Sequence, residues 1–226
     1  MFVSRGYRRF SGSCVRPFAA LLLAWAVLLL PSAAAYRKNL SQEEVSEAYY
    51  LGQRHDAQLG AFFSRYQRNL SPPREPGDYV SAVVIRTPYF LAVLRSAAAI
   101  GHYTTQQAWE DYRASSDQFE VVAYLDYSFG NKKAPKSEPP VAQDDLRGYY
   151  VQVKQMRNNE ERTLVAQDAH LERGIEGIGG ETALPVGLHL HTSFRVQDID
   201  SSDLTVEVTI PSGRRAVVTY NLQDLR

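Results

Sequence analysis

The sequence predicts an α+β fold, with an antiparallel β-sandwich-like domain of about six or seven strands and N-terminal helices packed on it. Apolar and polar residues alternate with a period of two in three C-terminal stretches, 187–196, 204–210 and 215–222. A fourth stretch, 118–127, shows the same period, whereas apolar residues before it recur at helical spacing. Strands with one apolar face must bury that face against a second sheet or against helices.

The first 35 residues have the layout of a secretory signal peptide. They hold four arginines and no acidic residue, then an uncharged apolar run from Phe18 to Leu30, then small residues up to Ala35. A helix of that run spans only about 20 Å, against about 30 Å of bilayer hydrocarbon. We therefore expect cleavage after Ala35, a secreted or periplasmic (cell-envelope) protein, and no transmembrane helix in the mature chain. The alternative is an uncleaved anchor, against which Pro31 argues because it interrupts a longer apolar helix.

The expected mature chain, 36–226, has a nearly balanced charge and no cysteine. The signal removes four of the 25 basic residues and none of the 25 acidic ones, which leaves 21 and 25, a net charge of about −4. A nucleic-acid partner has no support from such a composition. The single cysteine, Cys14, lies in the signal, so stability without a disulfide must come from a buried core.

Residues 36–70 are expected to form one amphipathic helix. Ser41 and Glu44 have the spacing of a capping box, and an aromatic-rich apolar stripe follows at helical spacing as far as Leu70. Gly52 and Gly60 weaken this helix, and a break near either is allowed. The stripe is interpreted as packing on the sheet, and an exposed ridge for a protein or envelope partner is the alternative.

Residues 79–226 are expected to form a helix-containing β-rich domain, in which 118–226 is the β-sandwich-like core. Before this core we expect a buried strand over 79–86, a helix over 89–100 and a short helix that a capping box opens at Thr104. Within the core, further strands are expected at 149–153 and 163–166. The glycine-rich segment 174–180 is interpreted as a loop, because it lacks the order and context of a phosphate-binding motif.

Two histidines on the strand 187–196 are the first candidate for a metal site. His189 and His191 alternate with Leu188, Leu190 and Phe194, so both imidazoles project from one face of the strand. A third ligand would come from elsewhere, and the nearest candidates along the chain are His170, Glu172 and Glu181. We favour the interpretation that places both histidines on a solvated face, with the leucines and Phe194 in the core, and the metal site is the alternative.

Three aspartates between two C-terminal strands are the second candidate. Asp198, Asp200 and Asp203 are carboxylates of the kind that calcium prefers, but their spacing does not fit an EF-hand loop, and aspartates are also common in turns.

No complete catalytic or cofactor-binding motif is present in the sequence. It contains no G-x-S-x-G elbow and no H-E-x-x-H helix, and the expected mature chain has no thiol. We therefore expect an exported, non-catalytic cell-envelope or secreted protein that binds or scaffolds a partner. The alternative is a metal-dependent hydrolase whose site lies on the face of the strand that carries His189 and His191.

Overall fold

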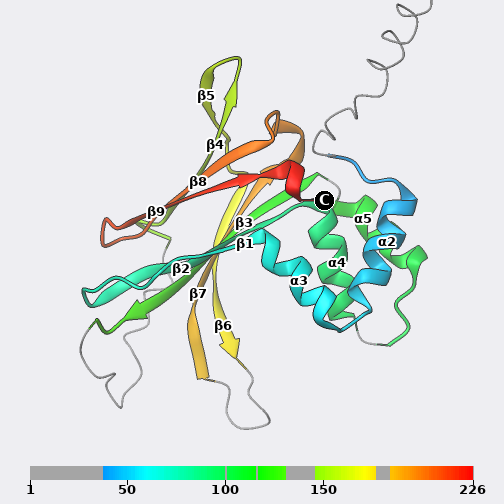
Figure 1. Cartoon of the computed structure of the whole chain (residues 1–226), viewed down its shortest axis with the longest axis horizontal. Helices are drawn as coiled ribbons and strands as arrows, with labels where there is room; N and C mark the ends of the chain where they lie inside the picture. The colour runs from blue at the N-terminus through cyan, green and yellow to red at the C-terminus, as the bar shows by residue number, and fades with distance from the viewer. Residues whose placement is uncertain (1–37, 100, 116, 131–145, 177–183, 226) are drawn as a thin grey trace, which may run out of the picture. The chain divides into compact units, whose positions relative to one another are not determined.

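The computed structural model describes residues 38–99, 101–115, 117–130, 146–176 and 184–225 (Figure 1). The expected signal peptide, Glu181 and most of the 174–180 segment lie outside these ranges. The described residues contain four helices and two antiparallel sheets of five and four strands, and the helices precede the seven strands from β3 onward. This confirms the predicted α+β, sandwich-like fold. No helix in the described ranges is long and apolar enough to cross a membrane.

The stretch expected to form one helix contains two helices and a short strand: α2 (Gln42–Gly52), α3 (Ala57–Tyr66) and β1 (Gln67–Asn69). The expected capping box is present, with Ser41 and Glu44 bonding each other's backbone. Two helices replace the single helix because the chain breaks after Gly52, one of the two positions where a break was allowed, and His55 in this turn has a φ of 49°. The carboxylate of Asp56 then accepts from two backbone N–H groups and starts α3.

Gly52 ends α2 at the point where this helix packs against α4 (Pro88–Ala98). A Cβ atom at Gly52 would lie 2.6 Å from the carbonyl oxygen of Val93, so only glycine allows this close approach. The helix expected over 89–100 is α4, which begins one residue earlier, with a side-chain cap from Thr87 and a proline, Pro88, in its first turn. The fourth helix, α5 (Thr105–Ser115), follows the expected cap at Thr104 and packs on α2 and α4.

The five-stranded sheet has the order β1-β2-β3-β7-β6. After β1, its strands are β2 (Gly77–Arg86), β3 (Gln118–Ser128), β6 (Asp168–Glu176) and β7 (Leu184–Arg195). The strands β1 and β6 were not expected from the sequence. The register places Val122 of β3 and His170 of β6 on either side of His191, and places Tyr124 and Glu172 on either side of His189.

The four-stranded sheet has the order β5-β4-β8-β9. Its strands are β4 (Tyr150–Arg157), β5 (Glu160–Thr163), β8 (Asp203–Thr209) and β9 (Arg215–Asn221). Asn158 and Asn159, both with positive φ, form the tight turn between β4 and β5. This turn places the strand at 160–163, and the strand expected at 163–166 was therefore wrong in all but its first residue.

One hydrophobic core draws side chains from the helices and from both sheets. Leu188, Leu190 and Phe194 of β7 are each at most 3% exposed, which confirms the predicted apolar face of this strand. The opposite face of β7 carries the histidines.

Candidate metal site

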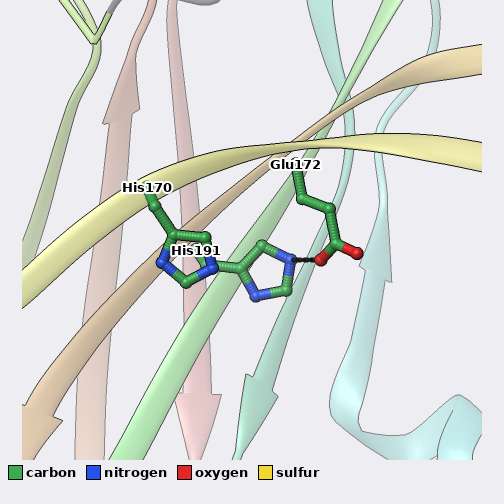
Figure 2. Close-up of side chains that lie close together, drawn as sticks. All are labelled: His170, Glu172 and His191. Carbon is green, nitrogen blue, oxygen red and sulfur yellow. Dashed lines mark ion pairs between the residues drawn. The ribbon is translucent and has the colours of Figure 1, made fainter.

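His170, Glu172 and His191 lie together on the five-stranded sheet (Figure 2). One ligand atom from each side chain can be chosen so that all three lie within 4.8 Å of one another. His170 and Glu172 project from the edge strand β6, and His191 projects from β7 directly beside His170. The two imidazole rings stack almost parallel, with centroids 4.8 Å apart and an interplanar angle of 9°.

His191 is buried, with 6% of its surface exposed. The predicted solvated face is therefore wrong for this residue. The reason is its position, since β7 is flanked by β3 and by the unexpected strand β6, and the ring of His170 stacks on that of His191. His170 and Glu172 are more than half exposed, so the cluster joins one fixed side chain to two that face solvent.

Glu120 of β3 and Arg86 of β2 support His191 from within the sheet. The Nδ1 atom of His191 lies 2.7 Å from Oε1 of Glu120, and Nη1 of Arg86 donates to Oε2 of Glu120 at 2.9 Å. Burial raises the pKa of the Glu120 carboxyl, but the hydrogen bond from His191 and the charge of Arg86 outweigh it, and the net pKa is lowered. An ionised carboxylate only accepts, so Nδ1 of His191 must carry the proton.

The other nitrogen of His191 has no hydrogen-bond partner among the described residues, although it is buried. Its Nε2 atom lies 3.3 Å from Oε2 of Glu172, which is within ion-pair distance but not in hydrogen-bond geometry. In a neutral imidazole with the proton on Nδ1, Nε2 presents a lone pair. In this neutral form two acceptors face each other, and a cation between them, either a proton on Nε2 or a metal ion, would relieve the repulsion.

His189 does not belong to this cluster. Its ring packs on Tyr124, with centroids 4.4 Å apart, and the His189 and His191 centroids are 6.3 Å apart. Burial, together with the neighbouring His191, lowers the pKa of His189. The structure thus brings His191 together with His170 and Glu172, two of the three residues named as a third ligand, and leaves His189 outside.

Sequence reasoning did not identify Glu120 and Arg86 as part of the site. The period of two over 118–127 places Glu120 on the polar face of its strand, which was a usable signal. The contact with His191 depends on β3 and β7 being neighbours, although Glu120 and His191 are 71 residues apart in sequence.

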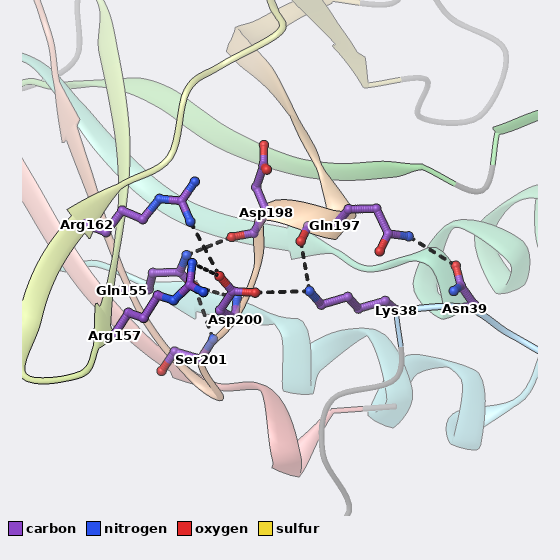
Figure 3. Close-up of polar contacts among 9 residues, drawn as sticks. All are labelled: Lys38, Asn39, Gln155, Arg157, Arg162, Gln197, Asp198, Asp200 and Ser201. Carbon is purple, nitrogen blue, oxygen red and sulfur yellow. Dashed lines mark hydrogen bonds and ion pairs between the residues drawn. The ribbon is translucent and has the colours of Figure 1, made fainter.

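Asp200, one of the three aspartates of the second candidate, lies in an ion-pair network (Figure 3). The Asp200 carboxylate lies 3.3 Å from Lys38, 3.1 Å from Arg157 and 3.4 Å from Arg162. Three cations already surround this carboxylate, which disfavours a calcium ion there. Within the described ranges, Asp198, Asp200 and Asp203 do not form a group that could hold a metal ion.

Comparison with known proteins gives no assignment for the site. No family model, curated protein or solved structure matches this chain. The function therefore has to be inferred from the geometry and chemistry of the residues themselves.

Proposed function

We propose that this chain is an exported protein that binds a divalent transition-metal ion through His170, Glu172 and His191. The observation that carries the proposal is the buried Nε2 atom of His191, which lacks a hydrogen bond within the described ranges and lies beside the Glu172 carboxylate. A buried polar atom without a partner is uncommon in native proteins and calls for an explanation. A bound metal ion supplies one, because it would accept the lone pair of Nε2 and the charge of Glu172 together.

The types of ligand favour zinc and its neighbours over calcium and magnesium. Imidazole nitrogen suits zinc, copper and nickel, whereas calcium and magnesium prefer sites made of oxygen ligands. Two histidines and one glutamate are also a common ligand set for zinc. Ligand atoms now within 4.8 Å would have to approach to about 3.3 Å for tetrahedral bonds of about 2.0 Å. His191 is held in the sheet, so the exposed side chains of His170 and Glu172 would make this movement.

The number of ligands supports metal-dependent hydrolysis as a second candidate function. Three protein ligands leave a fourth zinc position for water or a substrate, which is the arrangement of catalytic sites, whereas structural sites have four protein ligands. The His170 and Glu172 side chains are 54% and 64% exposed, so a molecule from solvent could reach that position. The residues proposed for this site are His170, Glu172 and His191, and His189 is not among them.

Export is part of the proposal and rests on the sequence of residues 1–35, with their arginines, apolar run and small residues. A secreted or periplasmic protein meets its metal ion outside the cytoplasm. Metal binding agrees with the expectation that this chain is a binding protein, with the metal ion as its ligand. A protein or envelope partner does not conflict with a bound metal ion.

Zinc binding by the untagged protein tests this proposal. The protein is freed of metal with a chelator, and zinc is then titrated in a calorimeter and measured by elemental analysis after dialysis. We expect about one ion per chain in the wild-type protein and loss of that ion in His191→Ala, because the fixed ligand is removed.

The matched control is His102→Ala, which removes an exposed histidine that lies outside the cluster. It should bind zinc as the wild type does. Equal zinc binding by the wild type and His191→Ala would show that any bound ion lies elsewhere, and the proposed site would be abandoned. Hydrolysis of simple ester and phosphate substrates by the zinc-loaded protein, compared with His191→Ala, tests the second candidate.

A further inference from the structure

We propose that Glu120, oriented by Arg86, is a positioning residue that keeps the proton of His191 on Nδ1 and leaves Nε2 free to bind the metal ion. This inference rests on the proposed function and deepens it, since it assigns the control of metal affinity to two residues that do not touch the ion. Histidine ligands in metal sites commonly donate their other ring N–H to a carboxylate, which fixes the tautomer and the orientation of the ring.

The two oxygens of Glu120 face two different partners. Oε1 lies 2.7 Å from Nδ1 of His191, and Oε2 accepts from Nη1 of Arg86 at 2.9 Å. The side chains of Glu120 and Arg86 are 15% and 18% exposed, so water competes little for these bonds. A guanidinium group only donates, which means that the group facing Arg86 must accept. The atom at position 120 that faces Arg86 must therefore be an acceptor, and the other end of that side chain faces His191.

This constraint gives the substitution Glu120→Gln a specific consequence. A glutamine has one oxygen, and Arg86 requires an acceptor, so that oxygen should turn to Arg86. The amide NH₂ would then face His191 and donate to Nδ1. Nδ1 must become an acceptor, and the proton of the neutral ring moves to Nε2, where it blocks the metal ion. A loss of charge alone would not change the tautomer in this way.

The first measurement uses metal-free protein and nitrogen NMR of the histidine rings at about pH 8, where an ordinary histidine is neutral. We expect the ring of His191 to carry its proton on Nδ1 in the wild-type protein and on Nε2 in Glu120→Gln. The Nε2–H tautomer in the wild-type protein would overturn the inference. This readout requires no metal, so it tests the role of Glu120 even if the protein binds no zinc and the proposed function fails.

The second measurement is zinc affinity by competition with a chromogenic chelator. Glu120→Gln should bind zinc about 10–100-fold more weakly, as is typical when such a partner of a histidine ligand is changed. The matched control is Glu207→Gln, which changes another largely buried glutamate paired with basic side chains in the other sheet. This control should leave zinc affinity unchanged. Equal affinity of Glu120→Gln and the wild type would contradict the inference.

The double variant Arg86→Met, Glu120→Gln supplies a rescue that a purely structural role would not produce. Without Arg86, the glutamine oxygen is free to accept from Nδ1 of His191, and the Nδ1–H tautomer should return. Zinc affinity should recover to within about tenfold of the wild type. Circular dichroism establishes that each variant is folded, and a folded double variant that keeps both the Nε2–H tautomer and the weak binding would overturn the role given to Arg86.

Discussion

The hydroxyl of Tyr220 donates a hydrogen bond to the carbonyl oxygen of Val83 at 2.6 Å, and this bond joins the two sheets. Tyr220 belongs to β9 of the four-stranded sheet and Val83 to β2 of the five-stranded sheet. The side chain is 2% exposed, and burial raises the pKa of its hydroxyl, so Tyr220 is protonated and donates at neutral pH. This hydrogen bond therefore adds a specific polar link between two sheets that share one hydrophobic core.

Replacement of Tyr220 by phenylalanine should lower the free energy of unfolding by about 1–3 kcal/mol, because the ring still fills its space while the carbonyl of Val83 loses a buried donor. Urea denaturation measures the change, provided that the slopes agree. Tyr150→Phe is the matched control, because the Tyr150 side chain is 63% exposed and its hydroxyl can bond to water. A Tyr220→Phe variant as stable as this control would mean that the bond between the sheets contributes nothing measurable.

Local patterns in the sequence were sufficient to predict much of the fold. The period of two identified β7, β8, β9 and β3 and the buried face of β7, because such a pattern reports which side chains share a face. Capping residues at Ser41 and Thr104 located two helix starts, because those hydrogen bonds are made within one turn. The strand β6 was missed although Asp168, His170 and Glu172 alternate with apolar neighbours, because the glycines that follow suggested a loop.

The candidate site was predictable only in part, because its geometry depends on which strands are neighbours. His170 and Glu172 were named as ligand candidates from their types and their nearness in sequence, and the pairing of β6 with β7 brings them to His191. His189 has the same residue type as His191 and lies on the same face, yet it packs on Tyr124. Nothing within a single strand distinguishes these two histidines, and only the register across the sheet does so.

The two histidines should differ in their effect on stability. His191→Ala should destabilise the metal-free protein by about 1.5–3 kcal/mol, because Glu120 loses a charge-assisted hydrogen bond in a buried setting. His189→Ala should cost less than about 1 kcal/mol, because this residue is only half-buried and its ring packs on the rings of Tyr124 and His191. Urea denaturation in the presence of a chelator compares them, and a larger loss in His189→Ala would reverse the assignment of the buried histidine.

Gln155 of β4 should stabilise the backbone conformation of the loop between β7 and β8 (Figure 3). Its amide donates to the carbonyl of Asp198 at 2.7 Å and accepts from the backbone N–H groups of Asp200 and Ser201 at 2.8 and 3.1 Å. Gln155→Ala removes all three bonds from a side chain that is 2% exposed, and should lower the free energy of unfolding by about 2–3 kcal/mol.

The matched control for Gln155 is Gln152→Ala, an exposed glutamine on the same strand. It should stay within about 0.5 kcal/mol of the wild type in thermal and urea denaturation. If the two alanine variants were equally stable, water would have to replace all three hydrogen bonds of Gln155 without cost.

The exported protein should begin at Tyr36. The small residues at 33–35 follow the apolar run at the position where a signal peptidase cuts. Intact-mass measurement and N-terminal sequencing of protein recovered from the exported fraction test this prediction. A chain that retains residues 1–35 and is recovered with the membranes would instead establish an uncleaved anchor.

The most direct test of the metal site is a crystal structure of the zinc-soaked protein, with diffraction recorded on both sides of the zinc absorption edge. We expect one strong anomalous peak within about 2.0–2.2 Å of His191 Nε2, a nitrogen of His170 and a carboxylate oxygen of Glu172. The Nδ1 atom of His191 should remain hydrogen-bonded to Glu120. A fully occupied zinc ion bound elsewhere on the chain, with His170, Glu172 and His191 unchanged and without anomalous density between them, would contradict the proposed function.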